Sequence, residues 1–212
     1  IAEQHRRLGA SADWEREAFT MDEARGRAVR QTFKQLYDDG LIYRAERIIN
    51  WDPVSQTAVS DIEVEYEDVE SAFWHVRYPV LGDDGKPTDQ YIVIATTRPE
   101  TIPADTAVAV NPEDDRFKDL IGRQVLVPTV DRAVTVIADE AVEIEGGSGA
   151  LKVTPGHDPV DFEIGERHGL EIINILNLDG TLNENAGPYS GMDRDAARRQ
   201  IVADLDDARI FV

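Results

Sequence analysis

Cysteine is absent from this 212-residue sequence, so neither a disulfide framework nor a thiolate metal site can form. The sequence also shows no secretory signal and no apolar run long enough to span a membrane, so we expect a cytoplasmic protein without membrane contact. Basic residues are scarce: 22 Lys and Arg stand against 42 Asp and Glu, a formal net charge of −20. Because phosphate contacts need a positive surface, this balance excludes general nucleic-acid binding and restricts any RNA contact to a local site.

A helix is predicted near the start of the sequence. Thr20 and Glu23 have the spacing of a capping box, and Val29, Phe33 and Tyr37 then fall on one helical face. Further helices are predicted at residues 114–121, 158–168 and 193–206.

Strands are predicted where apolar residues alternate with polar ones or form short runs between turn residues. They lie at residues 47–49, 62–66, 72–80, 91–95, 107–110, 124–128, 133–138 and 172–176, with a hairpin loop at 81–87. Trp51 and Trp74 are expected to be core aromatics. The length suits one well-buried core with an appended helical segment. The predicted fold class is therefore α+β, with a strand-rich, barrel-like core and flanking helices.

Residues 149–161 carry the densest group of reactive side chains: Lys152, Thr154, His157, Asp158 and Asp161. Lys152 and Thr154 share one face of a predicted strand, and Asp158 followed by proline is typical of a helix start. Asp158 and Asp161, three residues apart, share a face of the first helical turn. The side chains can therefore converge, and the two carboxylates could bind an ammonium group.

Other interpretations of these residues stay open. Asp158 and Asp161 also suit an ordinary helix start, as a cap and an acid that matches the helix dipole. A phosphate loop is excluded because the glycine-rich run at 146–149 lacks the Gly-Lys-Ser/Thr ending. The spacing of His157, Asp158, Asp161 and His168 matches no known zinc or calcium signature, so no metal is expected.

A second polar cluster follows the apolar run at 91–94 and consists of Thr96, Thr97, Arg98, Glu100 and Thr101. Threonine hydroxyls both donate and accept hydrogen bonds, and a guanidinium offers a planar fork suited to phosphate or ribose oxygens. The loop could therefore hold the end of a nucleotide. The alternative is an ordinary polar turn.

Together the two clusters resemble the editing domain of the valyl-tRNA synthetase family. The similarity rests on residues 96–101, 105–110 and 149–161. It continues in the same order through residues 137–140, 162–165, 173–175, 179–180 and 191–194, and residues 13–14, 19–22, 41–44 and 50–53 are similar to the segment that precedes the domain. The resemblance implies an editing domain at 59–212, behind an N-terminal helical segment at 1–58 that leads in from the synthetase catalytic core.

The resemblance implies post-transfer editing, the hydrolysis of threonine wrongly esterified to tRNA(Val). It assigns the substrate ammonium to Asp161 and the threonine hydroxyl and ester to Lys152, Thr154 and Asp158. His157, beside Asp158 in the sequence, is the nearest candidate base. The substrate- and tRNA-binding residues would be Thr96, Thr97, Arg98, Glu100 and Gly149. Water would attack the ester directly, because no Ser–His or Cys–His pair is recognisable. The implied partners are the 3′ end of tRNA(Val) carrying threonine and the catalytic domain of the same synthetase.

The His-Ile-Gly-His and Lys-Met-Ser-Lys-Ser signatures of such synthetases are missing, so ATP and Mg²⁺ belong to a catalytic domain outside this sequence, and editing itself is expected to need no cofactor. Residues 145–149 also lack the aromatic residue that the family usually has near Gly146, which leaves the contact with the terminal adenine open. Three alternatives remain: an isoleucyl- or leucyl-type editing domain, a noncatalytic module that positions the tRNA acceptor end, and a metal-dependent hydrolase using His157, Asp158 and Asp161.

Overall fold

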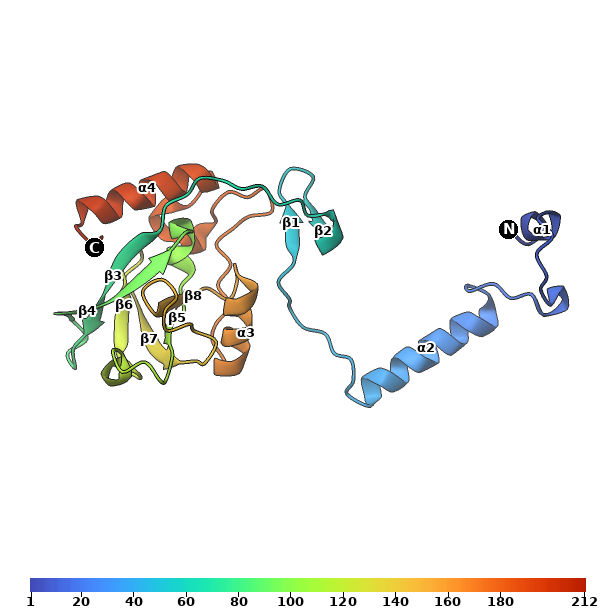
Figure 1. Cartoon of the computed structure of the whole chain (residues 1–212), viewed down its shortest axis with the longest axis horizontal. Helices are drawn as coiled ribbons and strands as arrows, with labels where there is room; N and C mark the ends of the chain where they lie inside the picture. The colour runs from blue at the N-terminus through green and yellow to red at the C-terminus, as the bar shows by residue number, and fades with distance from the viewer. The chain divides into compact units, whose positions relative to one another are not determined.

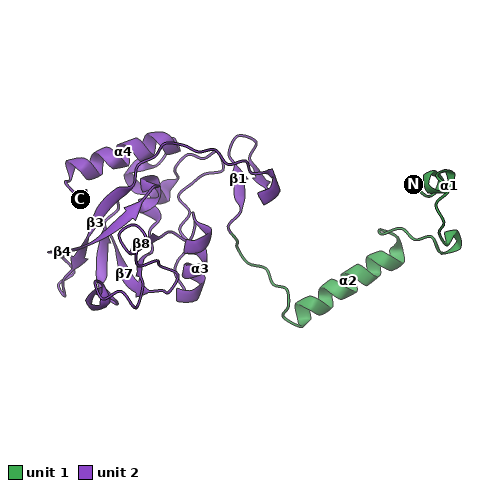
Figure 2. Ribbon diagram, in the orientation of Figure 1, with its two compact units in different colours: residues 1–47 green, residues 48–212 purple.

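The computed structural model describes residues 1–212, and the chain divides into two compact units, residues 1–47 and 48–212 (Figure 1, Figure 2). The first unit contains α1 (Ala2–Arg7), the 3-10 helix Trp14–Arg16 and α2 (Glu23–Asp38). The predicted helix is confirmed as α2, but Thr20 does not cap it. Its N-cap is Asp22, whose Oδ1 accepts a hydrogen bond from the Arg25 amide at 2.9 Å.

The apolar face of α2 is exposed to solvent. The helix contains no buried residue, and Val29, Phe33 and Tyr37 are all well exposed. An amphipathic helix is ordinarily held by packing of its apolar stripe, so α2 depends here on its cap and on exposed ion pairs along the helix. None of the helices is both long and apolar enough to cross a membrane.

The second unit holds all the strands. β1 (Asn50–Asp52) and β2 (Thr57–Val59) form a small antiparallel pair. The main sheet has six strands in the order β4-β3-β6-β7-β5-β8. Their bounds are Trp74–Leu81 for β3, Pro87–Thr96 for β4, Ala107–Val110 for β5, Gln124–Val127 for β6, Arg132–Ala138 for β7 and Ala150–Val153 for β8. Two helices, α3 (Pro159–His168) and α4 (Arg194–Asp207), complete the unit.

The main sheet curls until its two outer strands meet. β3 and β4 form a long antiparallel hairpin, whereas β5 runs parallel to β7 and antiparallel to β8. β4 and β8 stand at opposite ends of the hydrogen-bonded order, yet they lie against each other. The sheet is therefore a half-barrel, which confirms the predicted α+β, barrel-like class.

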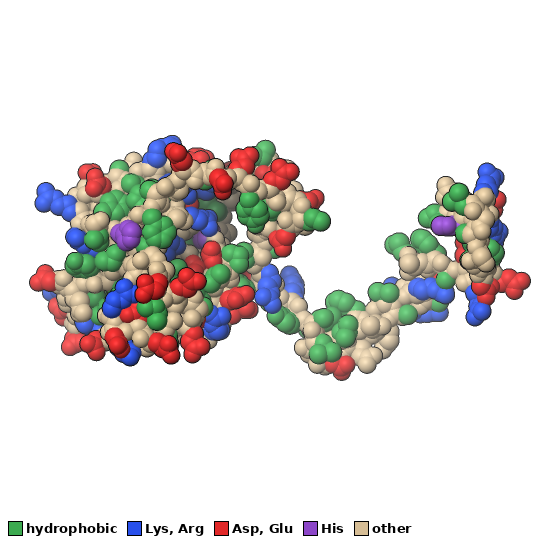
Figure 3. All heavy atoms as spheres, viewed as in Figure 1, with side chains coloured by type: hydrophobic (Ala, Val, Ile, Leu, Met, Phe, Trp, Pro, Cys, Tyr) green, Lys and Arg blue, Asp and Glu red, His purple; other side chains and the backbone are tan.

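The main core fills the inside of this curl. Every second residue in the middle of β3 is fully buried, namely Val76, Tyr78 and Val80. α4 covers this core with Ala197, Ile201 and Leu205, which lie four residues apart on one helical face. Acidic side chains gather along the lower edge of the second unit in Figure 3, as the net charge of −20 leads one to expect.

Some strand predictions are wrong because alternation occurs without a partner strand. Residues 62–66 form no strand: Asp61–Glu63 is a 3-10 helix capped by Ser60, and Ile62 and Tyr66 are more than 90% exposed. Residues 172–176 contribute only an isolated bridge from Leu176 to Leu182. The strand expected at 47–49 begins instead at residue 50.

Two further predictions need correction. The helix expected at 114–121 is only the short 3-10 helix Lys118–Leu120, because the Asp114 carboxylate accepts the Arg116 amide in a local turn. Trp51 is not a core residue: it is 38% exposed, and its indole N–H donates to the Leu178 carbonyl. Trp74 is half-buried and packs against the main core.

Replacing Ile201 with alanine tests the packing of α4. The side chain is fully buried, so Ile201→Ala is expected to lower the free energy of unfolding by about 2–5 kcal/mol through lost burial and a cavity. Arg199→Ala changes an exposed residue of the same helix and should shift stability by less than about 0.5 kcal/mol. Urea denaturation followed by circular dichroism measures both. Equal stability of the two variants would contradict this packing.

Candidate functional site

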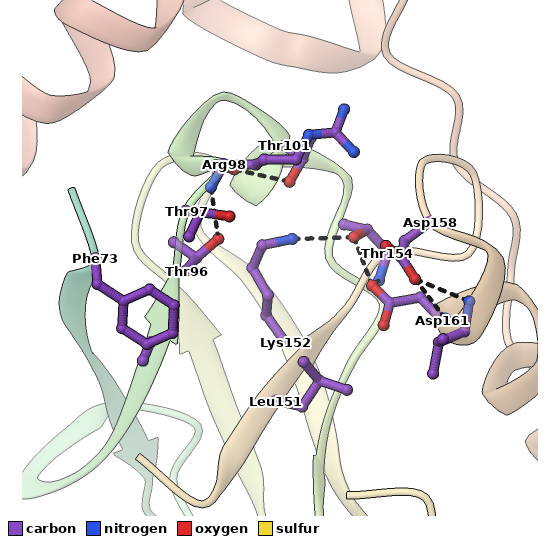
Figure 4. A pocket seen from close by; sticks show the side chains of 12 residues that line it. Phe73, Thr96, Thr97, Arg98, Thr101, Leu151, Lys152, Thr154, Asp158 and Asp161 are labelled. Atoms are coloured by element: carbon purple, nitrogen blue, oxygen red, sulfur yellow. Dashed lines mark hydrogen bonds between the residues drawn. The ribbon is translucent and has the colours of Figure 1, made fainter. Parts of the chain in front are cut away.

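A cavity of about 370 Å³ opens where β4 and β8 meet. Its walls come from four segments: the end of β4 with the loop that follows, β8 with Thr154, the first turn of α3, and Phe73 just before β3. Figure 4 shows Phe73, Thr96, Lys152 and Asp161 around one space, with the Arg98 guanidinium at its upper edge. The residues that line it are Phe73, Ala95, Thr96, Thr97, Arg98, Thr101, Leu151, Lys152, Thr154, Asp158, Val160 and Asp161.

Local sequence builds the wall formed by β8 and α3. After β8 the chain turns, with the His157 amide donating to the Thr154 carbonyl at 2.9 Å. Asp158 then caps α3: its Oδ1 accepts the Val160 amide at 2.8 Å and the Asp161 amide at 3.2 Å. Pro159 occupies the first helical position, where the missing N–H costs nothing. The predicted strand, turn and helix start are thus confirmed.

A chain of hydrogen bonds crosses the floor of the cavity. Lys152 Nζ donates to Thr154 Oγ1 at 3.0 Å, and Thr154 Oγ1 donates to Asp161 Oδ2 at 2.9 Å (Figure 4). The Thr154 amide donates to the same Oδ2 at 2.9 Å. All three residues are buried. Burial raises the pKa of Asp161 above its ordinary value, although Lys152 and the Thr154 hydrogen bonds act in the opposite direction.

Two residues behind Lys152 were not predicted. Asp105, between the loop and β5, is fully buried, and its Oδ1 lies 3.5 Å from Lys152 Nζ. Tyr78 of β3, also fully buried, donates its hydroxyl to Asp105 Oδ2 at 2.5 Å. Burial raises the pKa of Asp105 to about 7, even though Lys152 and the Tyr78 hydroxyl favour the ionised form. In the sequence, Asp105 stood out only as the first residue of the motif at 105–110, which gives no indication that it contacts Lys152 or Tyr78.

The threonine-rich loop is held by its own hydroxyls. Thr96 Oγ1 accepts the Arg98 amide at 3.0 Å, and Thr101 Oγ1 donates to the Arg98 carbonyl at 2.9 Å. Arg98 also donates from its guanidinium to the His157 carbonyl at 2.8 Å. This bond ties the loop to the turn after β8. The structure therefore brings together the two polar clusters of the sequence, with Thr97 and Arg98 facing the cavity.

Glu100 and Gly149 are not among the residues that line the cavity. Glu100 is buried and receives two hydrogen bonds from Arg198 of α4, at 2.8 and 2.9 Å. Burial raises the pKa of Glu100, but the hydrogen bonds and charge of Arg198 outweigh it and hold the pKa below its ordinary value. Gly149 has φ +79°, and a Cβ there would lie 2.2 Å from the Arg116 guanidinium. Both residues shape the fold around the site.

His157 also faces away from the cavity. Its Nε2 accepts the Ile175 amide at 3.1 Å, so the nitrogen that would take a proton is already occupied. Burial, followed by the charges of Arg98 and Lys152, lowers its pKa to about 4. The imidazole is therefore neutral at pH 7, with its proton on Nδ1. No group of three or more His, Asp or Glu side chains in residues 1–212 is arranged to hold a metal ion.

A second cavity, of about 410 Å³, adjoins the first. The two share Phe73, Ala95, Leu151 and Val160, and the second is otherwise bounded by the glycine loop and residues 141–143. Phe73 is 52% exposed, and its ring lies against Gly147, where a Cβ would be only 3.1 Å from Phe73 Cε1. Sequence reasoning missed Phe73 because an aromatic residue beside a strand is more often part of the core.

Residues 1–185 match the family of class I tRNA synthetases (I, L, M and V). The match covers most of the chain, which therefore belongs to this family. Its fold agrees with a solved structure of the family, the Agrobacterium radiobacter K84 agnB2 LeuRS in a ternary complex with tRNA and LeuAMS. The TM-score is 0.53 at 20% identity, over 99% of this chain and 34% of that chain.

Within the family the chain is similar to valine-tRNA ligases. It is 56% identical to that of Syntrophotalea carbinolica over 211 residues, 52% identical to that of Staphylococcus carnosus over 212, and 53% identical to that of Bacillus subtilis over 211. Each alignment covers the whole of this chain but only 23–24% of the relative. The chain thus spans about a quarter of the length of these relatives, and the predicted resemblance to valyl-tRNA synthetase is confirmed.

Arg198→Ala tests the ion pair that joins the threonine-rich loop to α4. Arg98 Nε also lies 3.5 Å from Glu100 Oε1, so the variant leaves Glu100 with this weaker partner alone. The change is expected to cost about 2–3 kcal/mol, less than for a fully buried pair because Arg98 remains and 33% of the Arg198 side chain is exposed. Glu100 has a lowered pKa, so this loss is full above about pH 4.5 and shrinks as the pH falls through the folded-state value. Urea denaturation at several pH values measures it, with Arg199→Ala as control. A loss independent of pH would contradict the role of Glu100.

Proposed function

We propose that this chain is the editing domain of a valine-tRNA ligase and hydrolyses threonine esterified to the terminal adenosine of tRNA(Val). The observation that carries the proposal is the buried chain Lys152–Thr154–Asp161 on the floor of an open cavity. A cavity for an apolar amino acid would be lined by apolar side chains. This one offers a cation, a hydroxyl and a carboxylate, which suit a substrate with an ammonium and a hydroxyl group.

Asp161 is the residue that we assign to the substrate ammonium. Both Thr154 hydrogen bonds end on Oδ2, so Oδ1 is the oxygen left to accept from the substrate. A bound ammonium would favour the ionised carboxylate and so lower the pKa that burial has raised. Lys152 and Thr154 lie beside it and suit the threonine hydroxyl, while Asp158 at the rim suits the ester region.

Discrimination against valine follows from these polar groups. A hydrophobic pocket cannot strongly reject a substrate that exchanges a methyl for a hydroxyl, so the synthetic site of a valine enzyme lets threonine through. A polar site reverses the preference, because valine leaves a buried donor or acceptor unpaired at a cost of about 1–3 kcal/mol. Correctly charged tRNA(Val) would therefore escape hydrolysis.

Direct attack by water is the mechanism we propose. No serine or cysteine lines the cavity beside a histidine, so a covalent intermediate lacks its nucleophile. His157 is unsuited to act as the base, because its Nε2 is bonded to the Ile175 amide and its pKa lies near 4. Arg98 and Thr97, at the mouth of the cavity, suit the ribose and phosphates of the tRNA end. They offer a local cation in a strongly acidic protein.

Deacylation assays test the proposal. The chain, alone and within the full-length ligase, is expected to hydrolyse threonyl-tRNA(Val) much faster than valyl-tRNA(Val). Asp161→Ala removes the ammonium site and should slow threonine release at least about 10-fold, or ~1.4 kcal/mol. Glu163→Gln, on the exposed side of α3, is the matched control and should leave the rate unchanged.

The outcomes separate the alternatives. No hydrolysis by the full-length ligase would mean that the domain only positions the tRNA acceptor end. Hydrolysis in the full ligase but not in the chain alone would mean that other segments hold the tRNA. Activity that a chelator abolishes would favour a metal-dependent hydrolase, whereas we expect activity to persist. A preference for isoleucyl- or leucyl-tRNA would reassign the type of editing domain.

Phe73 supplies the aromatic surface that the glycine loop lacks. Its half-exposed ring borders both cavities, so we assign the terminal adenine to a stack on this ring. Stacking of one base on an aromatic side chain contributes about 1–3 kcal/mol, so Phe73→Ala should lower kcat/KM for threonyl-tRNA(Val) by about 5- to 100-fold, mostly through KM. Phe73→Tyr should restore it. Tyr91→Ala, another half-exposed aromatic outside both cavities, should have no effect.

A further inference from the structure

Asp105 is a carboxylate with no access to the cavity. It is fully buried, and the groups that face its carboxylate come from three elements: Tyr78 of β3, Lys152 of β8 and, beyond Thr154, Asp161 of α3. A fourth element, β7, contributes Arg132, whose guanidinium donates to the Asp105 backbone carbonyl at 3.1 Å. The Tyr78 hydroxyl holds Oδ2 at 2.5 Å, and Oδ1 lies 3.5 Å from Lys152 Nζ. Lys152 lines the cavity and is in direct contact with the Asp105 carboxylate, so Asp105 acts on the cavity through Lys152.

Stability alone does not explain this arrangement. Burying a carboxylate and an ammonium costs several kcal/mol each in lost hydration. Their mutual attraction offsets this cost only when the two groups are close and well oriented. The separation of 3.5 Å is long for a charge-assisted hydrogen bond, which is usually about 2.7–2.9 Å. In other proteins, replacing a buried ion pair by apolar residues of similar volume is often neutral or stabilising. The pair instead fixes where the cation of the cavity lies.

The position of Lys152 decides how much charge Asp161 keeps. Lys152 reaches Asp161 through the Thr154 hydroxyl, and without a second anion the ammonium would be drawn to Asp161. A direct pair with Lys152 would occupy the carboxylate that the substrate ammonium needs. Asp105 lies on the other side of Lys152 and balances its charge there.

We propose that Asp105, held by Tyr78, is a positioning residue that keeps Lys152 against Thr154 and so leaves Asp161 free for the ammonium group of the substrate. This inference rests on the proposed function of the cavity. It adds two residues that never touch the substrate and act through Lys152.

A pH dependence follows. Because the pKa of Asp105 is raised to about 7, Asp105 is ionised and balances Lys152 above that pH, and becomes neutral below it. The neutral form releases Lys152 toward Asp161, so the rate of threonine release is expected to fall as the pH drops through about 7. Burial also raises the pKa of Asp161 in this group of residues, so variants are needed to assign the transition to Asp105.

Asp105→Asn is the first variant. In the full-length ligase we expect kcat for threonyl-tRNA(Val) to fall at least about 10-fold, with KM for the tRNA changed less than about 2-fold, because the tRNA contacts are untouched. The inflection near pH 7 should disappear from the kcat profile. Asp139→Asn removes another buried carboxylate, one paired with Arg167 outside the cavity. It controls for lost stability and should retain the wild-type pH profile.

Tyr78→Phe is the second variant, for use if Asp105→Asn fails to fold. It removes a single hydroxyl that favours ionised Asp105, so the inflection should move to higher pH. Carbon-13 NMR of the aspartate carboxyl groups gives a readout independent of activity: Asp105 should titrate near pH 7 in the wild type and higher in Tyr78→Phe.

Three results would overturn the inference. An active wild type with an unchanged kcat and pH profile in Asp105→Asn would show that Asp105 has no positioning role, while the proposed function stands. If Asp105 titrated with the pKa of an ordinary carboxyl group and Tyr78→Phe did not change that pKa, the proposed coupling between Tyr78, Asp105 and Lys152 would be wrong. Absence of hydrolysis by the wild-type ligase would remove both the proposed function and the role of Asp105 in it.

Discussion

The outer strands β4 and β8 meet without pairing, and the cavity depends on this meeting. In a closed barrel, ladder hydrogen bonds would bring the two strands to about 4.8 Å and leave no room between them. Here the strands are the two ends of the hydrogen-bonded order but still lie against each other. Side chains from both, such as Thr96 and Lys152, line the space instead. Two strands therefore supply the floor of the site, the threonine-rich loop and the start of α3 complete its walls, and the barrel core behind it stays packed.

Ion pairs that each contain a buried carboxylate join distant segments around this opening. Lys152 pairs with Asp105 across the sheet, Glu100 pairs with Arg198 between the threonine-rich loop and α4, and Asp139 pairs with Arg167 between the end of β7 and α3. Such pairs add little net stability, because desolvation offsets their attraction, but losing one partner is costly. They therefore fix the arrangement of the walls more than they strengthen the fold.

What the sequence predicts well is local. Asp158 followed by Pro159 predicts the start of α3. The long runs of alternating residues in β3 and β4 predict the hairpin. Alternation at residues 62–66 misleads because a strand also needs a neighbour, which short-range patterns do not reveal. Contacts between strands are equally hidden: Tyr78 and Asp105 are 27 residues apart and meet only through the curl of the sheet.

Roles assigned by adjacency in sequence are the least certain. His157 precedes Asp158 and seemed to share its site, but the turn after β8 directs the imidazole to the Ile175 amide. Glu100 lies within the threonine-rich loop and yet points to α4, because a buried carboxylate goes to the nearest guanidinium that can reach it with two hydrogen bonds. The direction in which a side chain leaves a turn depends on the backbone geometry of the turn, and the identity of the residue alone does not specify that geometry.

Counting donors on Lys152 gives the physical basis of selection in the proposed reaction. An ammonium has three N–H donors. Thr154 accepts one, and Asp105 faces a second at a longer distance, which leaves one for the cavity. Under the proposed function, water would satisfy that donor in the absence of substrate, and a threonine hydroxyl would replace the water. The methyl group of valine would displace the water without accepting a hydrogen bond. The bound valine ester would then leave one charged N–H of Lys152 unpaired, and this destabilises its binding relative to that of the threonine ester. In this proposal, selection against valine depends on Lys152 being buried and held in place. Asp105 and Tyr78 therefore contribute to it although neither lines the cavity.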